Sequence, residues 1–248
     1  MVIDFHTHGK ITNQFPFDEE GFQKKIEEAK QEGLDALALT EHSHAKNFSE
    51  AYHYLEKNFE FIDQFYLVNG VKVFTGVEVT TKEKLDVLFI GERNRILALN
   101  QQILKQTKEK DFIAIQDLFH LVNHQDFLVI LAHPYRKHEE LPKFDQAIFR
   151  KMDAIEFNAR DLYDYGIERM MEKVKKLGKA IQLPITGGSD SHYFLQIGSI
   201  RNRFQKDCST VAEMKEQIHL NQYSVELSNE LSIRVRASKI IKKLIVNG

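Results

Sequence analysis

The sequence predicts one α/β domain built on a parallel sheet, either a barrel or a doubly wound sheet. Short apolar strands alternate with amphipathic helices roughly seven times along the chain, which is the pattern of βαβ units. The strands repeatedly end in His, Asp or Glu, so we expect a polar site where the strands end. No repeat, low-complexity tract or linker interrupts this alternation.

Composition limits the classes of function. The 248 residues are 42% hydrophobic and 28% charged, which is ordinary for a globular domain. A net charge of -2 and a pI of about 6.6 give no global basic field that would indicate nucleic-acid binding. The single cysteine, Cys208, excludes a disulfide framework, and the sequence shows neither a signal peptide nor an apolar run of ~18 residues. We therefore expect a cytoplasmic protein that has no membrane partner.

The first strand leads directly into two histidines. In the segment 2–8, His6 and His8 are two residues apart, so on a strand their side chains share a face. Two neighbouring imidazoles at a strand end can bind one metal ion with little distortion.

The remaining elements follow in a regular order. Apolar runs predict strands at 34–40, 71–79, 85–90, 127–132, 154–158 and 183–188. Helical spacing predicts helices at 18–32, 47–65, 93–110, 116–125, 165–177, 210–219 and 228–244. Asp18 and Ser209 are the expected N-caps, and Gly33 and Gly178 are expected to end their helices.

Side chains that can bind metal ions recur at or near the predicted strand ends: His6, His8, His42, Glu78, Asp86, His133, Asp190 and His192. In an open sheet these residues would be spread along a line, whereas in a barrel they would converge on one mouth. Imidazoles and carboxylates without clustered cysteines favour Zn²⁺, Mn²⁺ or Fe²⁺ over a structural zinc site. Because a carboxylate can bridge two cations, the series predicts more than one ion. By contrast, His120 and His124 share a helix face but lack an intervening glutamate, so we interpret them as surface residues.

The ordered motifs resemble those of a known family. They are His6-Thr7-His8, Thr40-Glu41-His42, Gly76-Val77-Glu78, Ala132-His133-Pro134, Ile155-Glu156-Phe157-Asn158 and Gly188-Ser189-Asp190-Ser191-His192. This set resembles the PHP (polymerase and histidinol phosphatase) superfamily of metal-dependent phosphoesterases. The resemblance implies a distorted (β/α)7 TIM-like barrel with a metal site at the C-terminal ends of its strands. It implies a single domain, residues 1–248, with motifs spanning 6–192 and a C-terminal helical segment at 209–248.

The resemblance also implies a set of ligands for two or three divalent ions (Mn, Zn or Fe). One ion would be held by His6, His8, Glu78 and Asp190. A second would be held partly by His42 and His192, and a third by His133 together with a bridging Glu78. Glu156 and Asn158 would support the ligands rather than bind the ions.

The sequence departs from the family pattern at three places. Glu41 stands where the second motif usually has an aspartate, and its longer side chain moves a partner of the ligands. Asp86 stands where many members have a histidine, which favours harder ions such as Mn²⁺. The first loop offers Lys10, Asn13 and Gln14, none of which is a good ligand.

The implied activity is hydrolysis of a phosphate monoester or diester by a metal-bound hydroxide. Glu41 and Arg136 are the candidate catalytic residues. Lys10, Arg136 and Arg160 are the candidate cations for binding the phosphate, since guanidinium groups bind two oxygens at once. A small phosphorylated metabolite or nucleotide is the preferred substrate, and an oligonucleotide end is the second choice, on which the basic segment 234–243 could bear.

Two other functions remain open. A barrel amidohydrolase acting on C–N bonds also uses two histidines on a first strand and a late aspartate, although the Asp190–His192 pair and the His133-Pro134 step favour the phosphoesterase. A non-catalytic barrel with an altered metal site is the third interpretation, because Glu41 and Asp86 depart from the family pattern. Phosphate-ester turnover separates the first function from the second, and metal occupancy separates both from the third.

Overall fold

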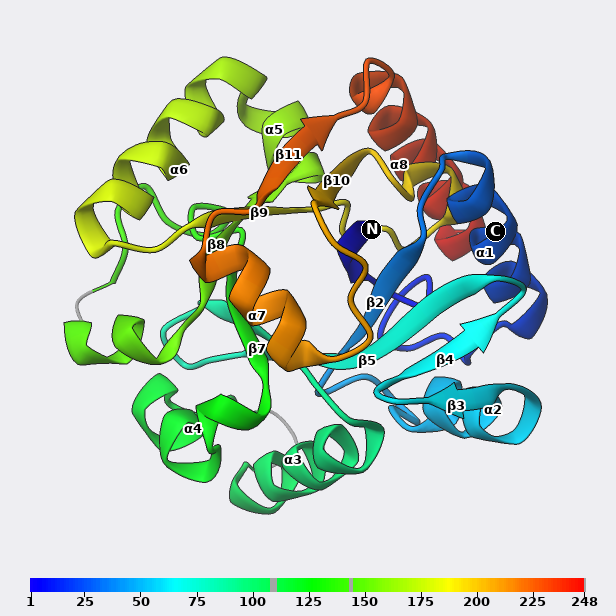
Figure 1. Cartoon of the computed structure of the whole chain (residues 1–248), viewed down its shortest axis with the longest axis horizontal. Coiled ribbons are helices and arrows are strands. Elements are labelled where there is room, and N and C mark those ends of the chain that lie inside the picture. The colour runs from blue at the N-terminus through cyan, green and yellow to red at the C-terminus, as the bar shows by residue number, and fades with distance from the viewer. Residues whose placement is uncertain (108–110, 143–144, 248) are drawn as a thin grey trace.

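Strands and helices alternate through most of the chain in the computed structural model, which describes residues 1–107, 111–142 and 145–247 (Figure 1). The strands are β1 (Val2–Thr7), β2 (Ala36–His42), β3 (Glu60–Ile62), β4 (Phe65–Val68), β5 (Val71–Thr80), β6 (Asp86–Ile90), β7 (Leu128–Ala132), β8 (Ala154–Asn158), β9 (Ile185–Gly188), β10 (Ile200–Phe204) and β11 (Tyr223–Leu227). The α-helices are α1 (Glu19–Gln31), α2 (Glu50–Asn58), α3 (Arg93–Gln106), α4 (Ile115–Leu121), α5 (Ala159–Tyr165), α6 (Ile167–Ile181), α7 (Val211–His219) and α8 (Leu231–Asn247). Three short 3₁₀ helices are η1 (His124–Asp126), η2 (Gln146–Lys151) and η3 (Phe194–Gln196).

The strands form a nearly closed barrel. Neighbouring strands run in the order β11-β10-β1-β2-β5-β6-β7-β8-β9, and Thr7 pairs with Ser191 just beyond β9, which closes the ring. Between β9 and β1 the buried side chain of Asn202 replaces the missing ladder: its amide accepts from Gly187 N at 2.7 Å and donates to Gly187 O and Ile3 O. These three backbone groups are therefore satisfied although no regular pairing joins the two strands.

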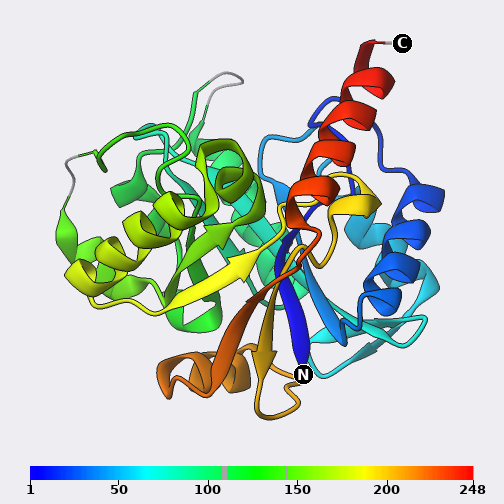
Figure 2. The same cartoon turned by 90° about the horizontal axis from the view of Figure 1, so that it is seen from above.

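Two apolar layers hold the barrel together. The inner layer is a plug of buried side chains that includes Ile3, Phe5, Phe74 and Leu88 and continues into α7 through Met214. Figures 1 and 2 show α7 across the end of the barrel at which the N-terminus lies. The outer layer packs the other faces of the strands against the surrounding helices. The opposite end of the barrel is left for polar residues.

The barrel prediction is confirmed, but the prediction of a purely parallel sheet is wrong. β6 pairs antiparallel with both β5 and β7, and β10 pairs antiparallel with β1. Asp86 is therefore the first residue of β6, opposite Thr80 at the end of β5. Because β6 runs in the opposite direction, its first residue, Asp86, lies at the end of the barrel where the parallel strands finish.

Several predicted boundaries are also wrong. The predicted helix at 47–65 ends at Asn58 and is followed by the β3–β4 hairpin, and the segment 209–248 contains β11 as well as helices. Thr210, rather than Ser209, caps α7, because its hydroxyl accepts from Glu213 N while the Glu213 carboxylate accepts from Thr210 N. Residues 108–110, where the helix predicted from Arg93 was expected to end, lie outside the described residues. Within the described ranges, no helix has the length and apolar content needed to cross a membrane.

Replacing Gly187 with alanine is expected to lower the free energy of unfolding by about 1–3 kcal/mol. The new Cβ would lie 2.2 Å from Ile200 Cγ2 and 2.9 Å from Val225 Cγ1, inside the packing between β9 and the β10–β11 pair. Urea denaturation measures this loss.

Gly21→Ala is the matched control. Gly21 lies in α1, where the new Cβ would meet only the exposed, movable carboxylate of Asp18. Since alanine is the better helix former, this variant should gain about 0.5–1 kcal/mol. Equal losses in both variants would contradict the packing assigned to Gly187.

Candidate metal centre

The inner faces of the strands change from apolar to polar toward one end of the barrel. On β2 the inner-face series begins with Ala36 and Ala38 and, by the alternation of a strand, reaches His42 at its end. On β5 the same alternation takes Phe74 to Glu78. The polar cluster is thus the uppermost inner layer of the barrel, stacked on the apolar plug.

An irregularity in β1 brings its two histidines into this layer. Ile3 and Phe5 belong to the inner plug, so simple alternation would turn His6 outward. Between Asp4 and Thr7, however, the register against β2 shifts, with three steps along β1 matching two along β2. This extra residue switches the face, as a β-bulge does, and His6 and His8 join the inner cluster.

Glu78 lies at the centre of the cluster. Its carboxylate is 2.9 Å from His42 Nδ1 and from His133 Nε2, 3.4 Å from His6 Nε2 and 3.5 Å from His8 Nε2. His6 lies on β1, His8 directly follows it, His42 ends β2, and His133 lies in the loop after β7. One carboxylate within reach of four imidazoles has the arrangement expected of a ligand shared between ions.

Asp190 forms a second focus beside Glu78. Its Oδ1 lies 3.2 Å from His8 Nε2, 3.6 Å from His6 Nε2 and 3.8 Å from His192 Nε2. Asp190 and His133 both adopt positive φ angles, 57° and 29°. Such backbone conformations cost energy in residues other than glycine and are concentrated at functional sites.

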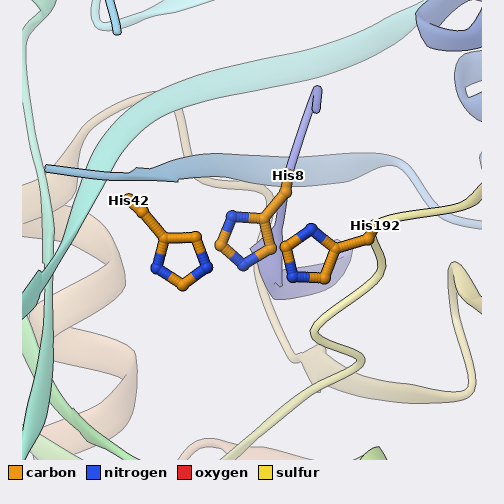
Figure 3. A group of neighbouring side chains, drawn as sticks. All are labelled: His8, His42 and His192. Atoms are coloured by element: carbon orange, nitrogen blue, oxygen red, sulfur yellow. The ribbon is translucent and has the colours of Figure 1, made fainter. Parts of the chain in front are cut away.

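Three of the histidines form a stack. The His8 ring lies between those of His42 and His192, with centroid distances of 4.5 Å and 4.1 Å (Figure 3). Their nitrogen atoms are close enough to hold one metal ion. Three further groups of the described residues meet the same criterion: His6–His8–Asp190, His6–His133–Glu156 and Glu78–Asp86–His133.

Several buried ligand atoms have no hydrogen-bond partner. They are His6 Nε2, His8 Nδ1, His42 Nδ1, Glu78 Oε2 and Asp86 Oδ1. Although His42 Nδ1 and Glu78 Oε2 are 2.9 Å apart, their geometry is not that of a hydrogen bond. Buried polar atoms are rarely left unpaired, and a cation would satisfy these atoms together. The residues present therefore fit a centre that binds divalent metal ions.

The electrostatics favour the metal-binding protonation state at His8, His192 and Asp190, whereas at His6 and His42 nearby carboxylates outweigh burial and raise the pKa. Burial, together with the neighbouring His42, lowers the pKa of His8 to about 3, so the His8 ring is neutral near pH 7. Burial likewise holds the pKa of His192 well below its usual value. Burial opposes ionisation of Asp190, but Arg136, His6 and His8 outweigh it and hold its pKa well below the usual range. Neutral imidazoles and ionised carboxylates are the forms that bind metal ions.

Glu156 orients two of the histidines. Its Oε1 lies 2.7 Å from His6 Nδ1, and its Oε2 accepts from His133 N at 3.0 Å and from Asn158 Nδ2 at 3.1 Å. A carboxylate bound to one ring nitrogen fixes the ring and leaves the other nitrogen free for a metal ion. This placement agrees with the supporting role expected for Glu156 and Asn158.

Asp86 approaches the cluster from the side of His133. Its Oδ2 is 3.6 Å from His133 Nδ1 and 2.8 Å from the ammonium of Lys137. Lys137 therefore neutralises one oxygen of Asp86, whereas Oδ1 has no hydrogen-bond partner. Asp86 therefore fits the position at which the family pattern has a histidine, and its Oδ1 is available to a cation.

The candidate catalytic residues lie around the cluster rather than within it. Glu41 is 1% exposed and accepts hydrogen bonds from Gly9 N and Lys10 N, so it fixes the loop that follows His8. The three guanidinium nitrogens of Arg136 contact Asp161, Asn158 and Asp190, each at 2.7 Å. Glu41 therefore positions the backbone after His8, and Arg136 positions the side chain of Asp190.

Of the other two candidate phosphate-binding cations, Lys10 is buried and Arg160 is exposed. The buried Lys10 ammonium donates to Lys46 O at 2.7 Å and to the Glu50 carboxylate at 2.8 Å, an arrangement that favours a structural role. Arg160 is 47% exposed, lies 3.5 Å from Asp164 and lines a cavity that also borders Asp190 and His192. Only Arg160 of these two is open to an incoming ligand.

Sequence reasoning missed Lys25. Its ammonium is fully enclosed and donates to His8 O and Ser191 O, joining the two loops that carry His8 and His192. A signal was present, because Lys25 shares the apolar face of α1 with Phe22, Ile26 and Ala29. A lysine on the buried face of a helix needs a polar partner inside the fold.

Glu156→Gln is expected to weaken metal binding by about 10–100-fold, the usual cost of losing a carboxylate that orients a histidine ligand. The amide cannot accept from both His6 Nδ1–H and His133 N–H. Metal content per chain after dialysis, measured by mass spectrometry, tests this. Glu172→Gln, on the exposed face of α6, is the control and should retain its metal. Unchanged metal content in Glu156→Gln would remove Glu156 from the centre.

Comparison with solved structures reveals the same fold in several proteins. PsfC from Pseudomonas syringae PB-5123 superposes with a TM-score of 0.78 at 23% identity, covering 98% of each chain. A complex of Endonuclease Q with a 27-mer duplex containing an abasic lesion has a TM-score of 0.64 at 20% identity, covering 88% of this chain and 56% of the endonuclease. The lesion-specific endonuclease PfuEndoQ from Pyrococcus furiosus has a TM-score of 0.63 at 18% identity, covering 91% of this chain and 58% of that protein. The chain thus spans little more than half the length of these endonucleases.

Comparison with curated proteins and with family models gives a match over part of the chain. No curated protein is detectably similar to this chain. Residues 171–223, from α6 through the beginning of β11, match the family model described as PHP-associated. This match and the fold shared with the endonucleases agree with the ordered motifs from His6 to His192. The match over residues 171–223 and these motifs support the resemblance to the PHP superfamily.

Proposed function

We propose that this protein is a metal-dependent phosphoesterase that hydrolyses a phosphate monoester or diester of a small metabolite or nucleotide. The observation that carries the proposal is the convergence of His6, His8, Glu78 and Asp190 in one buried layer with unpaired ligand atoms. The resemblance to the PHP superfamily supports the reaction class, and Endonuclease Q, which shares this fold, has been solved in complex with a DNA duplex that has an abasic lesion at the active site.

The ligand assignment proposed from the sequence fits these distances. His6, His8, Glu78 and Asp190 would hold one ion, and His42 and His192 would hold another through the stack around His8. His133 and Asp86 would hold a third with Glu78 as the shared carboxylate. Two or three ions, with Mn²⁺, Zn²⁺ or Fe²⁺ as the candidates, therefore match the donor set.

The metals would supply the nucleophile at neutral pH and would stabilise the charge on the phosphoryl oxygens. The protein's own residues keep the ligands in place and remove competing charges. Arg136 holds Asp190 ionised and oriented by a 2.7 Å contact, and Glu156 fixes the His6 ring. With all three of its nitrogens in contact with protein groups, Arg136 acts through Asp190, and phosphate binding falls to Arg160, which faces the cavity.

The C–N hydrolase is the second candidate, since barrel amidohydrolases share the first-strand histidines and the late aspartate. The stack of His42 and His192 on His8 favours the phosphoesterase, because it adds a further group of ligands to the pair on β1. Such a centre with several ions suits a phosphoryl group, which presents several oxygens to be bound at once.

Loading with Mn²⁺ is expected to give turnover of p-nitrophenyl phosphate or bis(p-nitrophenyl) phosphate, and Asp190→Asn should lower kcat/KM by at least about 100-fold, since metal ions supply several kcal/mol of transition-state stabilisation. The control is Asp117→Asn, on the exposed side of α4, which should leave the rate unchanged. Phosphate release and p-nitrophenol absorbance provide the measurements.

The same preparation is tested on a p-nitroanilide. Turnover of the anilide with neither phosphate ester hydrolysed would replace the proposed function with the C–N hydrolase. A metal-loaded protein that turns over none of these compounds would count against catalysis on activated esters and amides and favour the binding interpretation.

A further inference from the structure

A cavity of about 330 Å³ opens beside the candidate metal centre. Asp190 and His192 line it together with residues of α8 and with Arg160 of α5. Figure 2 shows α8 rising on the side of the molecule opposite the N-terminus, the side on which β1 ends at the cluster. A ligand bound at the metal centre can therefore extend into this cavity and contact α8.

The cavity wall is rich in positive charge. Arg160 on α5 and Lys239, Lys242 and Lys243 on α8 all line it. Asp164 offsets part of this charge, since it pairs with Lys239 and lies 3.5 Å from Arg160. Asp190, the acidic residue in the lining, is already engaged with Arg136 and the histidines. The cavity thus retains a positive excess on the side away from the metal centre.

Two polar groups in this wall have no partner. Lys242 is half-buried, and its ammonium makes no hydrogen bond or ion pair with any described residue. Ser238, one helical turn earlier and 4% exposed, has a buried hydroxyl without a hydrogen-bond partner. Residues four apart on a helix share a face, so both groups can serve the same ligand. A buried hydroxyl and a half-buried ammonium left unpaired are the groups that an incoming anion would satisfy.

We propose that Lys242, Ser238 and Arg160 form a second anion-binding site, which selects substrates carrying another phosphate or carboxylate group beyond the phosphoryl group at the metals. This inference rests on the proposed function and narrows its substrate class to small phosphate esters that carry a second anionic group. The apolar part of the wall, which includes Tyr193 and Val246, would contact the body that joins the two anionic groups. A cavity of about 330 Å³ is at the lower end of the range for small-molecule sites, which suits a compact substrate.

The test uses binding of phosphonates, in which a carbon replaces the bridging oxygen so that no hydrolysis occurs. 4-Carboxybenzylphosphonate carries a carboxylate in addition to its phosphonate, and its methyl carboxylate ester has nearly the same shape without the carboxylate charge. Isothermal titration of the Mn²⁺-loaded full chain gives Kd for both compounds. p-Xylylenediphosphonate, with a second phosphonate in place of the carboxylate, shows which anionic group is preferred.

Lys242→Met is expected to weaken binding of 4-carboxybenzylphosphonate by about tenfold, as loss of a charge-assisted hydrogen bond does, and to leave binding of its methyl ester unchanged. Ser238→Ala should act in the same direction and removes only an oxygen. Arg236→Met is the matched control, because Arg236 is an exposed cation on the same helix outside the cavity wall. It should change neither Kd.

Equal binding of 4-carboxybenzylphosphonate and its methyl ester to the unmodified protein would overturn the proposal. So would equal weakening of both compounds by Lys242→Met, or a loss in Arg236→Met as large as that in Lys242→Met. These outcomes are independent of turnover. If phosphate esters are not hydrolysed but the charged phosphonate binds selectively through Lys242, the proposed function fails while the second anion site stands.

Discussion

The carboxylate of Glu78 is 1% exposed and lies within 3.5 Å of imidazoles from His6, His8, His42 and His133. Burying ionisable groups costs several kcal/mol each unless charges and hydrogen bonds compensate. Here the compensation is incomplete, because Glu78 Oε2 and three of the imidazole nitrogens have no hydrogen-bond partner. The rest of the upper barrel is arranged around this cluster, and bound cations would complete it. Metal binding and stability of the fold are therefore expected to be linked.

Three features of the backbone deliver these side chains to one place. The register shift in β1 turns His6 and His8 inward, and the reversed β6 begins at the mouth with Asp86. Positive φ angles at His133 and Asp190 turn these residues off the ends of their segments into the cluster. A regular parallel barrel with uninterrupted alternation would not place the same residues together. The distortions of the barrel are thus part of how the site is built.

Much of this could be predicted from the sequence. The alternation of strands and helices left a barrel and a doubly wound sheet open, and the family resemblance of the ordered motifs implied the barrel and the residues that meet at its mouth. The β3–β4 hairpin was missed because Tyr52, Leu55, Phe59 and Ile62 fit helical spacing beyond the true end of α2. The Asn69-Gly70 pair, with φ of 51° and 87°, is a strong hairpin signal that could have identified β4. The bulge in β1 depends on pairing between distant strands, so local patterns carry no sign of it. The direction of β6 did have a local signal, because residues 81–85 between β5 and β6 are too few for the crossover that a parallel pair needs.

The roles of the charged residues were harder to predict than their positions. Lys10, Arg136 and Arg160 look alike in the sequence, yet Lys10 holds a loop, Arg136 holds Asp190, and Arg160 faces a cavity. Only the tertiary neighbours distinguish a cation that is already paired from one that is open to a ligand. The same reasoning separates Lys242 from Arg234, which is paired with Glu28, Glu32 and Glu230.

Anomalous diffraction from a crystal of the Mn²⁺-loaded protein tests the central claim most directly, because it locates the ions and counts them. The account predicts at least two peaks inside the cluster, one bounded by His6, His8 and Asp190 and one at the His8–His42–His192 stack, with Glu78 between them. A third peak is expected beside His133 and Asp86 if that group is filled. No peak within bonding distance of Glu78 or Asp190, or Mn²⁺ bound only at the surface, would contradict the claim that this cluster is a metal centre.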